Sequence, residues 1–339
     1  MWSEYILFLL KSVTFLIVVG VLISMLARLS KGGASAPGKG KLEITHLNKA
    51  LDSIKHKMQH EVLNKHQLKK IDKERKITEK EKKKEKSASE EPVRKCFSIR
   101  FKGDMQASQV SGLRQEVTAI LTVANPGDEV VVTIQSPGGA VSGYGLAATQ
   151  IMRLKDAGLT VTACVDQVAA SGGYMMACVA DKIIAAPFSI IGSIGVISQV
   201  PNIHRMLKRL DIDVDVITAG KHKAPLTLLG ENTDEGREKH KQDLSAIHER
   251  FKALVKFHRE QLEIDDVSEG DFWLASDALE MKLVDEIGTS DGYLFNLTQS
   301  SEVYRVQWVP HKSLEERLKG ASSALLASFE NFLSKTRLP

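Results

Sequence analysis

Apolar residues are spread unevenly along the 339-residue chain, and the first dense group of them occupies residues 5–29. A helix needs roughly 20 apolar residues to cross the hydrocarbon core of a bilayer, which is about 30 Å thick. This stretch therefore predicts an N-terminal transmembrane helix. A cleaved signal peptide is the alternative, because the small residues at 33–36 would suit a cleavage site, although its apolar core is usually only about 7–15 residues long.

Residues 30–94 are polar and rich in lysine, and they predict a basic linker that is either helical or disordered. A short amphipathic or coiled-coil stretch is indicated by four apolar residues that recur at three- and four-residue steps: Leu47, Leu51, Ile54 and Met58. Residues 69–86 then mix basic and acidic side chains with almost nothing to bury. No aromatic residue is interspersed among these charges, which argues against a nucleic-acid partner.

Beyond Cys96 the pattern changes to alternating strand-like and helix-like segments. Apolar and β-branched runs predict strands at residues 97–101, 129–136, 159–165, 182–186 and 214–218. Helical patterns occupy residues 111–124 and 143–157. Strands that alternate with helices predict an α/β domain with a largely parallel sheet, here over residues 95–300.

Two further apolar segments need separate interpretation. Residues 183–200 are apolar enough to suggest a second membrane span, but Pro187, Gly192 and Gly195 interrupt them, which favours a buried strand followed by a tight turn. Residues 301–339 predict a C-terminal extension with an amphipathic helix, because most of its apolar side chains fall on one helical face. We expect that face to pack on the domain or on a neighbouring subunit, with membrane contact as the alternative.

Composition narrows the classes of function. The net charge is only +4, but the linker concentrates positive charge beside the apolar segment, which favours contact with membrane lipid over nucleic acid. The three cysteines, Cys96, Cys164 and Cys178, lack the spacing of metal ligands, and their odd number argues against a disulfide framework. We expect neither a metal nor an organic cofactor.

Small-residue turns follow several of the predicted strands. Gly138 lies in the first of them, where glycine lets the backbone approach a substrate and direct N–H groups at it. Two such donors at about 2.7–3.1 Å stabilise a developing oxyanion. Ser171 stands between small residues at the start of a predicted helix, which exposes its Oγ and adds the Gly172 N–H to the same oxyanion hole. Taken alone, each feature is equally typical of an ordinary turn or helix N-cap.

A serine nucleophile needs a base that accepts its proton. His204 and His222 lie downstream of Ser171, but neither has an obvious orienting acid. Lys223, in the turn that follows the last predicted strand, is the stronger candidate. A lysine acts as a base only when it is neutral, so burial has to lower its pKa from about 10.4 toward about 7. The apolar run around Ser193 would supply that environment, and the Ser193 hydroxyl would hold the amine.

Together, the turn motifs resemble the signal peptide peptidase A family of bacterial serine–lysine proteases, in particular its SohB branch. The motifs are Ser-Pro-Gly-Gly at 136–139, Ser-Gly-Gly-Tyr at 171–174, Gly-Ser-Ile-Gly-Val at 192–196 and Gly-Lys-His-Lys at 220–223. The resemblance covers roughly residues 95–300. It implies the fold that crotonases share with the Clp protease subunit.

Carried over position by position, the resemblance implies that Ser171 is the nucleophile and Lys223 the general base. Ser193 would orient the lysine, and Gly138 would donate to the oxyanion. One position departs from the family pattern, because His222 stands directly before the lysine, where relatives commonly carry tyrosine. A second lysine lies two positions before Lys223, so the choice between the two rests on the motif match.

These implications describe a membrane-anchored serine endopeptidase that cleaves peptides or membrane-associated proteins, such as signal-peptide remnants or substrates of quality control. A single copy of the catalytic unit also implies a ring of identical subunits. Two other classes of function stay open. A crotonase-like acyl-CoA enzyme would share the oxyanion hole but relies on acidic residues where this chain has small ones, and a membrane scaffold would carry a vestigial dyad.

Two lines of evidence on membrane topology disagree. Basic residues follow the predicted span, which by the positive-inside rule places the domain in the cytoplasm. The family resemblance implies the far side of the bacterial inner membrane, and long domains translocate despite flanking charge. We therefore expect the catalytic domain in the periplasm.

Overall fold

The strands with the longest β-branched runs lie at the centre of the domain. The computed structural model describes residues 11, 14, 40–71 and 94–310, and residues 41–309 form one compact unit. Its elements in chain order are β1 (Gly40–His46), α2 (Leu47–Val62), β2 (Lys95–Lys102), α4 (Val110–Leu121), β3 (Glu129–Gln135), α5 (Val141–Asp156), β4 (Thr160–Val165), β5 (Val168–Ala170), α6 (Gly172–Ala177), β6 (Lys182–Ala185), β7 (Ile190–Gly192), α7 (His204–Arg209), α8 (Asp234–His258), a 3₁₀ turn (Ile264–Val267), β8 (Phe272–Leu274), α9 (Ala275–Glu280), β9 (Glu286–Ile287), α10 (Ser290–Leu297) and β10 (Glu302–Pro310).

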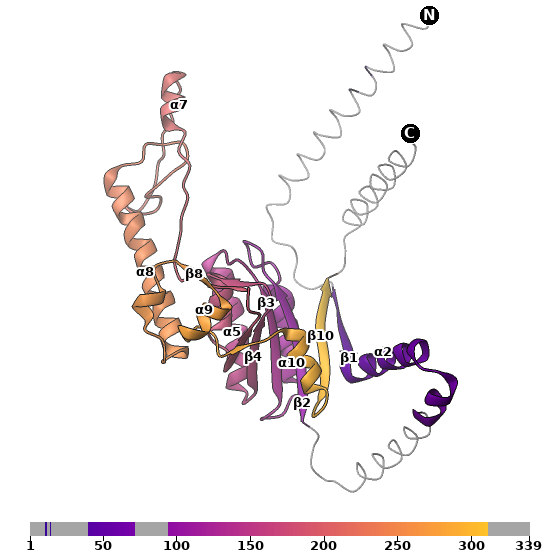
Figure 1. The fold of residues 1–339 in the computed structure, drawn as a ribbon. Helices are drawn as coiled ribbons and strands as arrows, with labels where there is room; N and C mark the ends of the chain where they lie inside the picture. Colours follow the sequence, from indigo (N-terminus) through magenta and orange to yellow (C-terminus); the bar gives the residue numbers. More distant parts are fainter. Residues whose placement is uncertain (1–10, 12–13, 15–39, 72–93, 311–339) are drawn as a thin grey trace, which may run out of the picture. The chain divides into compact units, whose positions relative to one another are not determined.

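The described residues form a seven-stranded sheet in the order β1-β10-β2-β3-β4-β6-β9 (Figure 1). From β10 to β9 all neighbouring strands pair in parallel. β3 is buried along its length, which explains why its sequence is a continuous apolar run rather than an alternating one. A smaller sheet, β5-β7-β8, has β5 parallel and β8 antiparallel to β7. The predicted α/β class with a largely parallel sheet is confirmed.

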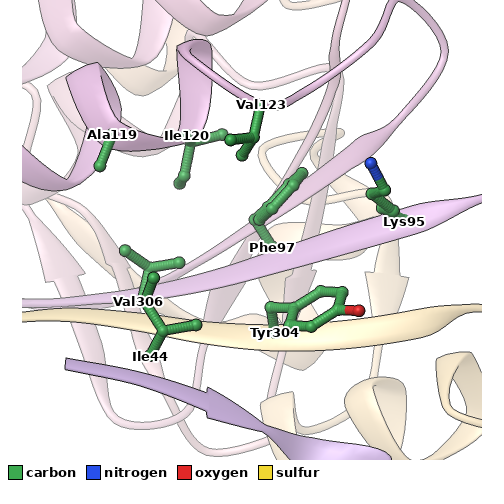
Figure 2. Close-up of a pocket in the computed structure, with 8 residues that line it drawn as sticks. All are labelled: Ile44, Lys95, Phe97, Ala119, Ile120, Val123, Tyr304 and Val306. Atoms are coloured by element: carbon green, nitrogen blue, oxygen red, sulfur yellow. The ribbon is translucent and has the colours of Figure 1, made fainter.

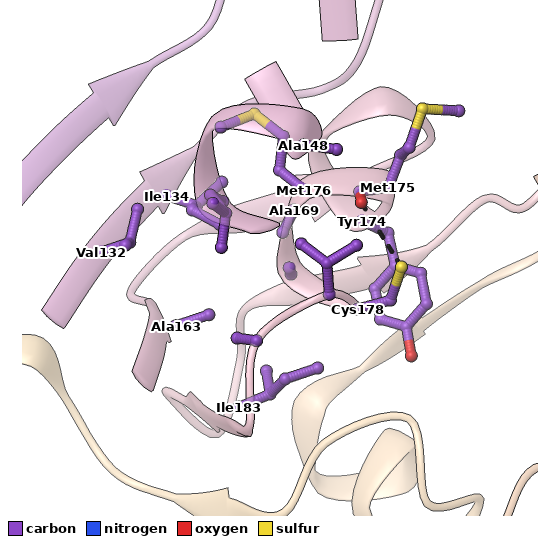
Figure 3. Close-up of a cluster of buried hydrophobic side chains, with 14 of the residues drawn as sticks. Val132, Ile134, Ala148, Ala163, Ala169, Tyr174, Met175, Met176, Cys178 and Ile183 are labelled. Atoms are coloured by element: carbon purple, nitrogen blue, oxygen red, sulfur yellow. Dashed lines mark hydrogen bonds between the residues drawn. The ribbon is translucent and has the colours of Figure 1, made fainter. Parts of the chain in front are cut away.

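Alternate residues of the central strands face two apolar clusters on opposite faces of the sheet. On one face, Phe97 and Val132 belong to the cluster that also contains the buried apolar side chains of α4, α5 and α6. On the other face, Val131 and Val303 pack with Leu294 of α10. Figure 3 shows how the side chains of α6 lie among those of β3 and β4. This packing fixes the position of the strand-to-helix turn that immediately precedes α6.

The prediction that residues 30–94 are all linker is wrong for the part that forms β1 and α2. β1 takes the edge position beside β10, and α2 follows it directly. The Asn48 side-chain amide donates to the carbonyl oxygens of Thr298 and Ser301, both at 2.9 Å, and its oxygen accepts from the Val303 N–H at 2.8 Å. β1 and α2 therefore belong to the folded domain, which a polar sequence pattern alone did not indicate.

The C-terminal boundary also differs from the prediction. Residues 302–310, which were expected to begin a helical extension over 301–339, form strand β10 and pair in parallel with β2. Val303 and Val306 are buried on opposite faces of the sheet. The β-branched and aromatic residues of this segment favour a strand once a neighbouring strand is available. The predicted amphipathic face from residue 313 onward lies outside the described residues.

Three other expectations can be compared with the structure. Residues 183–200 contain β6, β7 and an irregular segment, which confirms a buried strand and turn rather than a second span. Residues 214–218 are irregular and mostly exposed, so the strand predicted there is wrong. The helices within the described residues are all too short or too polar to cross a membrane. The span predicted at residues 5–29 lies almost entirely outside the described residues.

An apolar cavity of about 270 Å³ lies between α4 and the strands β1, β10 and β2 (Figure 2). β1 contributes one wall of it, which again places this strand in the domain. The cavity is separate from the turn that precedes α6. Its lining residues are Ile44, Lys95, Phe97, Ala119, Ile120, Val123, Tyr304 and Val306.

Candidate active site

Ser171 occupies a sharp turn between β5 and α6. Its backbone has φ 51° and ψ −118°, a conformation that non-glycine residues rarely adopt. Strain of this kind costs on the order of 1–3 kcal/mol and is kept where the surroundings enforce it, often at functional sites. Here the Ser171 N–H donates to the Gly192 carbonyl at 2.8 Å, and its own carbonyl accepts from the Met175 N–H at 2.9 Å. A strained strand-to-helix turn of this type exposes the Oγ of a nucleophilic serine.

The turn after β3 lies directly against Ser171. Gly138 has φ +94°, and a Cβ at this position would lie 2.7 Å from the Ser171 Cβ, so only glycine fits. The Gly138 N–H donates to the Ser136 Oγ at 3.0 Å, and it is therefore already used. The N–H of the next residue, Gly139, has no acceptor among the described residues. The structure thus brings the predicted Gly138 to the site but leaves Gly139 as the free donor of that turn.

The Gly172 N–H is the second free donor. Gly172 is the first residue of α6, where helical N–H groups have no intrahelical acceptor, and no acceptor for it is present within the described part of the chain. A Cβ on Gly172 would lie 2.4 Å from Cγ of the buried Tyr144 ring. The Tyr144 hydroxyl contacts the Ser136 Oγ and donates to the Asp104 carbonyl at 2.8 Å. This network holds the two glycine turns together.

Ser193 lies beside Ser171 because the two turns are hydrogen-bonded. The carbonyl that accepts the Ser171 N–H belongs to Gly192, the residue directly before Ser193. Ser193 itself has φ 53°, and its N–H donates to the Asp271 carbonyl at 2.6 Å. Both serine side chains line one cavity of about 860 Å³. The structure therefore brings together Ser171, Ser193 and the two glycine turns, as predicted.

Most of the cavity wall is apolar or backbone. Met175 of α6 lies on one side, and Ile247, His248 and Phe251 of α8 lie on another. His248 and Glu269 are the titratable side chains among the described lining residues. Apolar walls with a few polar groups are typical of a site that binds a peptide or small molecule.

The structure does not bring Lys223 to this cavity. Lys223 is exposed, lies in an irregular segment between α7 and α8, and is absent from the cavity lining. The buried environment expected around a lysine base is therefore not formed within this single chain. The nearby Lys221 is also exposed, and its Nζ lies 2.9 Å from the Glu235 Oε1. This ion pair lowers the pKa of the Glu235 carboxyl.

Three residues at the site lie outside the predicted set. Gly139 directly follows the predicted donor Gly138, and the paired glycines are the signal for it. Tyr144 has the pattern of an ordinary helical core residue. His248 lies in a long charged helix with no motif around it, so only the packing of α8 shows that it reaches the cavity.

Comparison with known proteins gives the family. The model of the peptidase family S49 N-terminal region matches residues 1–151, and that of peptidase family S49 matches residues 153–304. The chain belongs to peptidase family S49. The second S49 match contains both serine turns and the segment with Lys223.

Named relatives agree with this S49 membership. A probable protease SohB of Haemophilus influenzae is 50% identical over 218 residues, which are 64% of this chain and 62% of that protein. A probable protease SohB of Buchnera aphidicola subsp. Acyrthosiphon pisum is 47% identical over 245 residues, 72% of this chain and 71% of that protein. A putative protease of Methanocaldococcus jannaschii is 32% identical over 190 residues, 55% of this chain and 60% of that protein. The resemblance to the SohB branch is confirmed: the chain belongs to a peptidase family, and these relatives are named probable or putative proteases.

Proposed function

We propose that this S49 peptidase is a serine endopeptidase in which Ser171 is the nucleophile. The observation that carries the proposal is the strained Ser171 turn, which opens into the same cavity as Ser193 and the free Gly172 N–H. Family membership supports proteolysis, and the geometry supplies a serine with oxyanion donors beside it. A peptide carbonyl bound in this cavity would lie within reach of both the Ser171 Oγ and the oxyanion donors.

The chemistry follows from these groups. The Ser171 Oγ attacks the scissile carbonyl while Lys223, in its neutral form, accepts the hydroxyl proton. The carbonyl oxygen becomes an oxyanion that accepts hydrogen bonds from the N–H groups of Gly172 and Gly139. The lysine then gives the proton to the leaving amine, which departs and leaves an acyl-enzyme. Water, deprotonated by the same lysine, hydrolyses the ester and restores Ser171.

Lys223 completes this dyad only after assembly, because it is exposed and outside the cavity of the single chain. We propose a homo-oligomeric ring in which the segment carrying Lys223 packs at a subunit interface beside a Ser171 cavity. This segment, between α7 and α8, exposes large apolar side chains, with Ile217 93% and Leu228 49% exposed. Exposed apolar residues gathered on one segment indicate a protein–protein contact.

Two observations favour Lys223 over Lys221 as the base. The Lys221 Nζ lies 2.9 Å from the Glu235 Oε1, and it would have to leave this ion pair to reach a serine. Lys223 has no ion-pair partner within the described chain. Burial at an interface would then lower the pKa of Lys223 toward the operating range of a base.

Fluorophosphonate labelling tests the nucleophile. The intact protein should be labelled at one serine, and Ser171→Ala should abolish both labelling and turnover of a fluorogenic peptide. Retained labelling in Ser171→Ala would overturn the proposal. The same experiment separates it from its rivals, because neither an acyl-CoA enzyme of the crotonase type nor a scaffold with a vestigial dyad would be labelled at Ser171.

Paired lysine variants test the base. Lys223→Ala should abolish peptide turnover while the circular dichroism spectrum is unchanged, whereas Lys221→Ala should retain most activity. Wild-type activity should rise with pH, because a protonated amine cannot accept the serine proton. Full activity in Lys223→Ala, or maximal wild-type activity near pH 5, would refute the lysine base.

We further propose that the protein is anchored in the bacterial inner membrane by residues 5–29, with the catalytic domain in the periplasm. Its substrates would be signal-peptide remnants or damaged proteins at the membrane. Proteolysis of spheroplasts tests the topology. The region 95–339 should be digested while the inner membrane is intact, and digestion only after lysis would place it in the cytoplasm.

A further inference from the structure

The turn that carries Ser193 is strained and depends on its surroundings for its shape. Gly192 and Ser193 are consecutive and both have positive φ, at 104° and 53°. The second of these is unfavourable for a residue with a side chain. Such a conformation persists only where neighbouring groups enforce it. One restraint is the hydrogen bond from the Ser193 N–H to the Asp271 carbonyl.

A second restraint comes from the long helix α8. The His248 Nε2 lies 3.2 Å from the carbonyl oxygen of Ile194, the residue directly after Ser193. A carbonyl oxygen can only accept, so the Nε2 is the donor in this contact. His248 is half-buried and lines the Ser171 cavity.

The helix that presents His248 is itself firmly placed. Phe251 is 3% exposed and Val255 is fully buried, and both belong to the main apolar cluster. On the other side of the contact, Ile194 is also fully buried in that cluster. The hydrogen bond therefore joins two parts of the packed core beside the cavity, rather than two mobile surface groups.

We infer that His248 is a positioning residue that holds the Ser193 turn in its strained conformation through Ile194. The inference rests on the proposed function, in which Ser193 orients the Lys223 amine. His248 touches neither Ser171 nor Lys223 by a hydrogen bond within the described residues. Loss of its N–H donor releases the turn, moves the Ser193 hydroxyl and slows catalysis without removing the nucleophile.

Three variants separate this role from a general structural one. His248→Leu removes the N–H donor and puts an apolar side chain of similar bulk in its place. His248→Gln restores an N–H at a similar distance from the backbone but cannot act as a base near neutral pH. His240→Leu is the matched control, because His240 lies two turns earlier on α8, contacts the Ser198 Oγ at 2.9 Å, and does not line the cavity.

The full-length variants are compared by kcat and KM on a fluorogenic peptide, by pH profile and by hydrogen exchange of the turn. His248→Leu should lower kcat on the order of 10- to 100-fold with little change in KM, since small misplacements of catalytic groups have effects of this size. His248→Gln should recover most of the loss with the wild-type pH profile, and His240→Leu should behave as wild type. Amide exchange at Ser193 and Gly195 should accelerate only in His248→Leu.

Each contrary result has a definite meaning. Wild-type kcat in His248→Leu overturns the inference, as does a His248→Gln variant that is as inactive as His248→Leu, because that would show a chemical role for the imidazole. If the wild type is labelled at Ser171 but His248→Leu is unaffected, the inference fails and the proposed function stands. If Ser171 is not labelled in the wild type, the proposed function fails, and hydrogen exchange still tests the restraint.

Discussion

At the scale of single residues, the site depends on glycines, which have no side chain, as much as on its serines. The Tyr144 ring lies directly against Gly172, and the Ser136 backbone lies directly against Gly173. Ser171 lies in the same way against Gly138. These close approaches pack the Ser171 turn against α5 and against the turn that follows β3. Glycine at these positions is therefore a packing requirement, independent of any part it takes in chemistry.

Gly172→Ala tests this requirement. The added methyl group would lie 2.4 Å from the Tyr144 Cγ, so the ring or the turn has to move. We expect a loss of about 1–3 kcal/mol in the free energy of unfolding and a large loss of peptide turnover. Gly145→Ala is the control, since nothing lies within 4 Å of its Cβ and it sits inside α5, where alanine stabilises by roughly 0.5–1 kcal/mol. Equal effects of the two variants would contradict the packing argument, and unfolding curves with a peptide assay would show which holds.

Glu116 gives a prediction about pH. It is 5% exposed on α4, and its Oε1 accepts from the Trp308 N–H of β10 at 2.7 Å. Burial raises the pKa of the Glu116 carboxyl from 4.5 to about 7, against a smaller opposing effect of that hydrogen bond. The folded state therefore binds the proton more tightly than the unfolded state, and stability contributed by the protonated group is lost as pH rises from about 4.5 to about 7.

Glu116→Gln removes this pH dependence while keeping a side-chain oxygen that accepts from Trp308. Relative to wild type, the variant should gain up to roughly 3 kcal/mol between pH 4.5 and pH 7, with no further gain above pH 7. Denaturant unfolding across that range measures the difference. The exposed Glu280→Gln serves as the control. A constant difference between Glu116→Gln and wild type at all pH values would show that the carboxyl does not titrate in this window.

At the scale of elements, the edge of the sheet is held by a few specific contacts. Asn48 uses its whole side-chain amide to bond three backbone groups around the start of β10. His46 packs its ring edge on Tyr304 at 4.7 Å between centroids. These contacts join an N-terminal helix to a C-terminal strand across more than 250 positions of sequence.

Asn48→Ala should therefore destabilise the domain. It leaves two carbonyl oxygens and one N–H without partners in a partly buried position, and each such group costs on the order of 1–3 kcal/mol when it is fully desolvated. We expect a loss of about 2 kcal/mol or more in chemical unfolding. Ser53→Ala on the same helix removes only a bond to the Lys49 carbonyl and should stay within about 0.5 kcal/mol of wild type. If Asn48→Ala is as stable as wild type, the Asn48 hydrogen bonds do not anchor α2 to the domain.

At the scale of the whole molecule, the proposed ring makes the dyad a property of the assembly. If Lys223 of one subunit serves Ser171 of its neighbour, two inactive variants should complement each other. Co-expressed Ser171→Ala and Lys223→Ala chains should regain up to about a quarter of wild-type turnover in randomly mixed rings. Each variant alone is the control. Absence of activity in verified mixed oligomers would show that the serine and the lysine act within one chain.

The sequence by itself determined the α/β class, most of the central strands and the serine turns. β3 could be predicted because a strand buried on both faces requires an uninterrupted apolar run, whichever neighbours it has. The glycine turns could be predicted because tight backbone with positive φ favours glycine locally. Ser171 and Ser193 could be predicted because the short motifs around them resemble those of one family. Local rules suffice wherever the constraint lies within a few residues.

Only the tertiary structure decided which segments complete the domain and which groups meet at the site. β1 is an edge strand beside β10, so two segments more than 250 positions apart lie next to each other. Residues 214–218 resemble a strand but form none in the structure. His248 reaches the Ser193 turn only because α8 packs on the core, and Lys223 stays outside the cavity despite its motif. These outcomes depend on contacts distant in sequence, and a hydrophobic pattern does not encode the partner of a strand or a polar side chain.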